Sequence, residues 1–172
     1  MRQHQNINTL FTTIGHPLYE FNEAVQRLRE EHTILEEGLG ELCAVAKTIG
    51  EDNQVADWTS QLRELRVKAK AFQLELEAHS KWEEEKMFPM IAWYFGEELV
   101  QFPLMEQEHE LAKQCIEAFF KAVDRIHQAV RCAEAQDMAA YLLQASSILK
   151  HHFRKEEEII QALEDRSNGF GY

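Results

Sequence analysis

The sequence has few of the residues that interrupt helices, with only seven glycines and three prolines among 172 residues. It also has few of the alternating valine, isoleucine and threonine runs that are typical of strands. No apolar run approaches the roughly 18–20 residues that a membrane-spanning helix needs, and the N-terminal residues lack the apolar core of a signal peptide. These absences argue against a membrane protein and favour long helices.

Cysteine and positive charge are scarce as well. The three cysteines, Cys43, Cys115 and Cys132, are odd in number and widely spaced, which favours reduced thiols in a cytoplasmic protein over a disulfide framework. The 18 lysines and arginines are outnumbered by 30 acidic residues, which gives a formal net charge of −12. Such a surface repels phosphate backbones, so we expect no nucleic-acid partner.

The length and the 45% hydrophobic content suit one globular domain with a sizeable core. We therefore expect 1–172 to form a single domain, as a monomer or a homodimer. Its parts are a helical bundle over about 20–165, an N-terminal segment at 1–19 and a C-terminal tail at 166–172.

Four segments place apolar residues at alternating steps of three and four, which is the pattern of a helix that packs in a bundle. These segments run from Phe21 to Ile49, from Trp58 to Met87, from Met105 to Val130 and from Met138 to Leu163. Between them lie a turn at 50–53, an aromatic connector from Pro89 to Pro103, and Asp137, a predicted N-cap for the last helix. Such short connections predict an all-α, antiparallel, up-down-up-down four-helix bundle.

Six polar residues interrupt the apolar face, or seam, of these helices. They are His32, His79, Glu83, His109, His152 and Glu156. A buried, ionised carboxylate without a partner costs on the order of 3–5 kcal/mol, so each of these residues must have a compensating interaction.

In antiparallel helices, residues at one height are equidistant from the turn that joins them. The midpoints between successive members of the set fall near positions 56, 95 and 131, in or beside the predicted connections, so all six are expected at one level.

The chain also repeats itself, because "REEHTIL" and "HSKWEEE" in the first half are matched by "EQEHELA" and "HFRKEEE" in the second. Each half supplies one lone histidine and one His-x-x-x-Glu pair, whose members share a helix face. Four imidazoles and two carboxylates suit iron or manganese, and also zinc. The alternative is a set of core histidines that hydrogen-bond to their neighbours, but a common level on four helices favours a metal site with two bridging carboxylates.

Other polar and aromatic residues lie off the seams. Glu36 and His127 each lie one position off a seam, so neither is expected to be a ligand. We expect the remaining acids and His151 to face solvent: Glu84, Glu85, His151, Glu157 and Glu158. Trp82, Trp93 and Tyr94 are expected to pack near the metal level or to line a pocket, and small ligands are expected to enter past the aromatic connector.

The pattern H…HxxxE…H…HxxxE, with Glu-His pairs at 31–32 and 108–109, resembles the hemerythrin-like HHE cation-binding proteins. The resemblance covers 29–158 and implies a non-haem di-iron centre, oxo- or hydroxo-bridged, with the six seam residues as ligands and both glutamates as bridges. Oxygen-carrying hemerythrins have a second histidine one turn after the third-helix histidine, where this chain has Lys113. The ligand set is therefore closer to that of the repair-of-iron-centres proteins, which are linked to nitrosative stress.

Three functions remain open at this point. The centre could handle a small ligand such as O2, NO or peroxide, it could deliver iron to damaged iron centres, or it could be a structural or storage site for zinc or iron. Optical spectra separate them, because an oxo-bridged diferric centre absorbs in the near-ultraviolet and responds to azide or NO, whereas a zinc site is silent.

Overall fold

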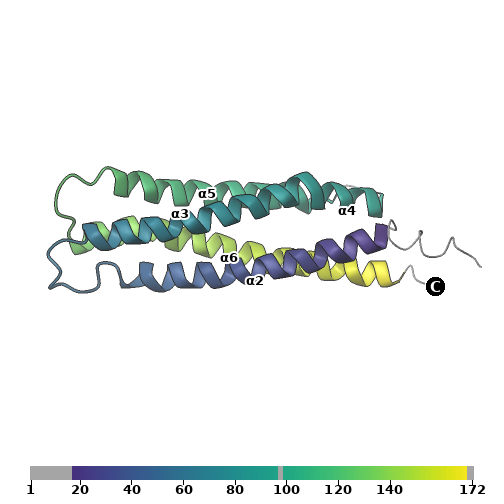
Figure 1. Cartoon of the computed structure of the whole chain (residues 1–172), viewed down its shortest axis with the longest axis horizontal. Coiled ribbons are helices and arrows are strands. Elements are labelled where there is room, and N and C mark those ends of the chain that lie inside the picture. Colours follow the sequence, from purple (N-terminus) through teal and green to yellow (C-terminus); the bar gives the residue numbers. More distant parts are fainter. Residues whose placement is uncertain (1–16, 97–98, 170–172) are drawn as a thin grey trace, which may run out of the picture.

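The computed structural model describes residues 17–96 and 99–169, and these residues form helices joined by short connections. The long helices are α2 (Pro17–Thr48), α3 (Thr59–Trp82), α5 (Gln101–Asp124) and α6 (Cys132–Asn168). They run alternately up and down, so that the two loops at 49–58 and 125–131 lie at one end of the bundle (Figure 1). The described residues contain no strand, which confirms the predicted all-α, antiparallel four-helix bundle. That 1–172 form one domain stays a prediction.

The two loops at that end are tied together by Asp57. Its Oδ1 accepts hydrogen bonds from the backbone N–H of Val130 at 3.0 Å and from the backbone N–H of Thr59 at 3.0 Å. Trp58 N–H also donates to the Val130 carbonyl at 3.0 Å. Val130 is thus buried in the loop, and its predicted place in the third helix is wrong because that helix ends at Asp124.

The last helix begins at Cys132, five residues before the predicted N-cap Asp137, which lies within the helix. The early start is fixed by contacts with the first loop. Gln136 Nε2 donates to the carbonyl of Gly50 at 3.0 Å. Gly50 has a φ of 79°, and a Cβ on it would lie 2.5 Å from the Cys132 carbonyl oxygen, so this close approach requires glycine.

The opposite end contains a further helical segment where a connector was predicted. After Trp82 the chain continues as the π-helical turn η1 (Glu83–Met87) and then as α4 (Phe88–Phe95), which ends at Gly96 with a φ of 72°. Pro89 lacks an N–H and would clash with a carbonyl of a continuous α-helix, and a π turn accommodates such a break. The wider turn keeps both Glu83 and Met87 buried, at 0% and 1% exposure.

Two apolar clusters lie on either side of the six polar seam residues. The larger one extends toward the loop end and includes Leu35, Leu76 and Phe153. The smaller one extends toward the α4 end and includes Leu28, Met87 and Met105. Met138 and Ile159, which the predicted apolar face of the last helix includes, are half-buried and pack against these clusters. The neighbouring Ala139 and Ile160 are fully buried, because a strict step of three and four drifts around a straight helix by about 20° per heptad.

Candidate metal centre

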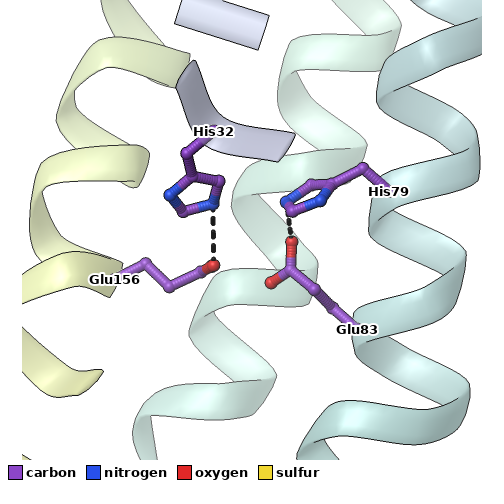
Figure 2. Close-up of side chains that lie close together, drawn as sticks. All are labelled: His32, His79, Glu83 and Glu156. Carbon is purple, nitrogen blue, oxygen red and sulfur yellow. Dashed lines mark ion pairs between the residues drawn. The ribbon is translucent and has the colours of Figure 1, made fainter. Parts of the chain in front are cut away.

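The six polar residues of the seams lie together at one level of the bundle. They come from α2 (His32), α3 (His79), η1 (Glu83), α5 (His109) and α6 (His152 and Glu156). All six are more than nine-tenths buried, and Glu83 and His152 have no exposed surface at all. Figure 2 shows four of them, with both imidazole rings and both carboxylates turned toward a common centre.

The side chains form two overlapping groups of potential ligands. One group is His32, His79, Glu83 and Glu156, and the other is Glu83, His109, His152 and Glu156. Within each group the ligand atoms all lie within 4.8 Å of one another. Both groups include both carboxylates, so Glu83 and Glu156 lie where the two groups overlap.

The carboxylate of Glu156 contacts an imidazole of each group. Its Oε1 lies 3.1 Å from His32 Nε2, and its Oε2 lies 3.0 Å from His152 Nε2 (Figure 2 shows the first contact). Glu83 Oε1 contacts His79 Nε2 and lies 3.9 Å from His109 Nε2. Each carboxylate is therefore adjacent to one imidazole of each half of the bundle.

The outer nitrogen, Nδ1, of three of the imidazoles faces a carboxylate. His79 Nδ1 lies 2.6 Å from Glu31 Oε2, His109 Nδ1 lies 3.1 Å from Glu84 Oε1, and His152 Nδ1 lies 3.0 Å from Glu108 Oε2. Because a carboxylate accepts, these imidazoles donate from Nδ1 and present a lone pair at Nε2. A hydrogen-bonded Nδ1 is the usual arrangement of a metal-binding histidine, since it fixes the tautomer and the ring orientation.

Eight buried nitrogen and oxygen atoms that could bind a metal have no hydrogen-bond partner among the described residues. They are the Nε2 atoms of His32, His79, His109 and His152 and both carboxylate oxygens of Glu83 and Glu156. For His79, His109 and His152, which donate from Nδ1, the lone pair at Nε2 faces the lone pairs of the carboxylates, and only cations or added protons can satisfy such an arrangement. The nitrogen and oxygen donors suit iron, manganese or zinc, so the residues present fit a metal centre.

Without a metal, burial and the neighbouring groups shift the pKa values of these carboxylates and imidazoles. Burial and the neighbouring Glu156 raise the pKa of Glu83 well above its usual value. Burial would also raise the pKa of Glu156, but the adjacent imidazoles of His152 and His32 outweigh it and keep this pKa well below the usual range. Burial lowers the pKa of His79, and burial together with His152 lowers that of His109 to about 3. These two imidazoles are neutral near pH 7, the form that binds metals.

The comparison with protein families agrees with this geometry. Residues 23–169 match the model of the hemerythrin HHE cation-binding domain. The chain belongs to the hemerythrin HHE cation-binding family. Comparisons with curated proteins and with solved structures found no match. Among the residues that the structure describes, none of the hemerythrin-like helices is long and apolar enough to cross a membrane.

The contacts of three carboxylates with the outer nitrogens were not found by sequence reasoning. Glu84 is exposed, as expected, but it also meets His109 Nδ1. Each of the three carboxylates lies next to a seam residue in the sequence but hydrogen-bonds the histidine of a neighbouring helix. The repeated Glu-His pairs at 31–32 and 108–109 were the available signal, because each glutamate lies one position off the seam, toward the adjacent helix.

The other polar candidates lie outside the hemerythrin-like centre. His127 is exposed in the second loop, 3.0 Å from the carbonyl of Arg125, and His151 is exposed on α6. Tyr94 does not support the centre, because its hydroxyl lies 3.0 Å from Ser167 Oγ. Trp82 packs beside His79, with ring centroids 6.2 Å apart, as expected.

Access to the centre past the aromatic connector stays a prediction. At the α4 end, Phe21 stacks on Tyr94 with ring centroids 5.6 Å apart and meets Phe95 edge-on at 5.7 Å, so these rings pack together along the predicted route. Three depressions reach the histidines from the sides of the bundle. One of about 270 Å³ is lined by His109 and Lys113, one of about 300 Å³ by His79, and one of about 430 Å³ by His32.

Proposed function

We propose that the chain binds two iron ions through the six seam residues and handles a small ligand such as O2, NO or peroxide there. The observation that supports this most directly is the convergence of eight unpartnered donor atoms in the core, arranged as two groups that share Glu83 and Glu156. Iron bound at these positions would supply redox and ligand-exchange chemistry. Manganese or zinc in the same donor set is the alternative that metal analysis decides.

The chain's own residues prepare the site in three ways. The carboxylates at the outer nitrogens hold three imidazoles in one tautomer and direct Nε2 inward. The two apolar clusters exclude water from above and below the centre. Lys113 lines the depression beside His109 and offers a positive charge to an anionic ligand on its way in.

Delivery of iron to damaged iron centres is a second candidate function. It is favoured by the depressions that reach three of the four histidines from solvent, because an iron donor must release its ion as well as bind it. A cytoplasmic location belongs to either proposal and is supported by three cysteines that form no disulfide, as in a reducing compartment.

The first prediction concerns metal content. A chain reconstituted with ferrous iron without oxygen and then desalted is expected to retain two iron ions, because each of the two ligand groups supplies two imidazoles and two shared carboxylates. Iron per chain is measured by elemental analysis, and manganese and zinc are offered in competition. A folded chain that retains no transition metal would contradict the proposal.

The second prediction concerns ligand access. Ser80 lines the depression beside His109, so Ser80→Phe is expected to slow azide binding to the oxidised, iron-loaded chain by filling that space. Phe95→Ala, at the α4 end of the bundle where Phe95 packs against Phe21, is the comparison and is expected to leave the rate unchanged. Stopped-flow absorbance gives both rates. Faster binding in Phe95→Ala together with no change in Ser80→Phe would place the entrance at the α4 end.

A further inference from the structure

The two halves of the bundle correspond residue by residue around the centre. His32 of α2 corresponds to His109 of α5, and the run that begins at His79 corresponds to the run that begins at His152. Glu31 and Glu108 are then equivalent, and they make equivalent contacts with His79 and His152. Any difference between the halves in the contacts to the outer nitrogens therefore results from a difference in sequence.

Among residues 17–96 and 99–169, one of the four expected contacts to an outer nitrogen, that of His32, is missing. Glu84 meets the outer nitrogen of His109, and its equivalent in the second half is Glu157, which should meet His32. Glu157 Oε1 instead accepts a hydrogen bond from Arg29 Nε at 2.8 Å. In the part of the chain that the structure describes, no group hydrogen-bonds His32 Nδ1. In Figure 2 the outer ring nitrogen of His32 points toward α6, the helix that contains Glu157.

Arg29, on α2, accounts for the missing contact between Glu157 and His32. Arg29 also binds Glu164 with both of its terminal nitrogens, at 2.6 and 3.1 Å, and so has a fixed position between α2 and α6. Its equivalent on α5 is Glu106, an acid that cannot draw Glu84 away from His109.

The contact of Glu31 with His79 is weakened by a second arginine. Arg27 Nε donates to Glu31 Oε1 at 2.7 Å, while His79 uses Oε2 of the same carboxylate. The equivalent of Arg27 on α5 is Leu104, which has no charge. A carboxylate that is already paired with a guanidinium is a poorer acceptor for the imidazole N–H, because part of its negative charge is neutralised.

We infer that the two metal positions are unequal, and that the position between His32 and His79 binds its ion more weakly and releases it first. The inference rests on the proposed binding of two ions. Carboxylates behind metal-binding histidines fix the ring and raise its basicity, and their loss lowers metal affinity by about 10- to 100-fold. Among the described residues, His109 and His152 each have such a carboxylate without an arginine beside it, whereas His32 has none and His79 shares one with Arg27.

The depression beside His32 gives the weaker position a route to solvent. It has a volume of about 430 Å³ and is lined by His32, Arg29, Glu157 and Glu158. The same arginine that withdraws Glu157 from His32 thus borders the opening beside it. An ion could leave here without disturbing the pair of histidines on α5 and α6.

The test is the release of iron from the fully loaded chain. The chain loaded with two ferrous ions without oxygen is mixed with an excess of a coloured ferrous chelator, and release is followed by absorbance. Two phases of equal amplitude are expected. Glu84→Gln should accelerate the slow phase by about 10- to 100-fold, because it removes the acceptor behind His109. Its matched control, Glu157→Gln, should change neither phase, because Arg29 already occupies Glu157.

A second pair of variants tests the role of the arginine. Arg29→Met should free Glu157 to reach His32 and slow the fast phase, and Arg29→Met combined with Glu157→Gln should lose this gain. Arg66→Met removes another ion pair between helices, Arg66–Asp124, and should leave release unchanged. If Arg29→Met fails to fold, the comparison of Glu84→Gln with Glu157→Gln still decides.

Two results would overturn the inference alone. One is a single release phase for both ions, and the other is an equal effect of Glu84→Gln and Glu157→Gln. A chain that takes up fewer than two iron ions would instead end the proposed function, and the inference with it. The two failures are therefore distinguishable by the iron content before the chelator is added.

Discussion

Glu83→Ala is expected to reduce the iron content from two ions per chain to nearly none. The reason is that Glu83 belongs to both groups of ligands, so its loss removes an oxygen donor from both positions at once. A histidine belongs to only one group, and His32→Ala is expected to leave close to one ion. Iron per chain after anaerobic reconstitution and desalting measures both effects, and near-ultraviolet absorption of the oxidised sample reports whether two ions remain together.

Glu85→Ala is the matched control for this prediction. It removes the same charge from the same π turn, but the Glu85 side chain is exposed and its carboxylate lies 3.9 Å from Lys81 at the surface. Its iron content should equal that of the unaltered chain. If Glu83→Ala retained both ions while Glu85→Ala lost them, the assignment of Glu83 to the centre would be wrong.

The sequence was sufficient to identify the bundle and the level of its six polar residues because burial repeats with the helix. A histidine such as His79 at a seam position must face the core once the helix forms, whatever its neighbours are. The midpoint argument then places residues of different helices at one height, since antiparallel helices joined by short turns are constrained in register.

Contacts between helices could not be predicted in the same way. Arg29 and Glu157 are 128 residues apart, and both lie off the seams, where periodicity carries no information. The loss of the carboxylate behind His32 therefore becomes visible only when the rotation of α2 against α6 is known. The π turn at 83–87 was also missed, because one residue added to a helical turn changes the periodicity only locally.

The helix boundaries were misplaced for a related reason. Asp137 has the chemistry of an N-cap, but the contacts of Gln136 and Cys132 with the first loop extend the helix by more than a turn beyond it. Local propensity is a weak preference, and contacts made by the folded chain override it.

The same centre should make the metal-free protein less stable than it could be. Glu83 has no exposed surface, and neither of its oxygens has a hydrogen-bond partner among the described residues. Leaving such groups unsatisfied in a core costs about 1–3 kcal/mol each. Glu83→Met is expected to raise the free energy of unfolding of the metal-free chain by about 1–3 kcal/mol, and each kcal/mol raises Tm by about 2–4 °C in a chain of this size.

The stability gained by Glu83→Met is expected to depend on pH. Burial and Glu156 raise the pKa of Glu83 in the folded chain well above the value of about 4.3 that an unfolded glutamate has. A group with a raised folded pKa contributes stability that is fully present below the unfolded pKa and is lost as the pH rises through the folded pKa. The advantage of Glu83→Met should therefore be small at pH 4 and grow toward pH 8. Thermal unfolding of both metal-free chains across this range measures the advantage, with Glu85→Met, an exposed substitution of the same kind, as the control.

With iron bound, the order of the two melting temperatures should reverse, because ligand binding then stabilises only the unaltered chain. A metal-free Glu83→Met chain that melts below the unaltered one at pH 8 would mean that Glu83 makes a net favourable contact with His79 even without a metal.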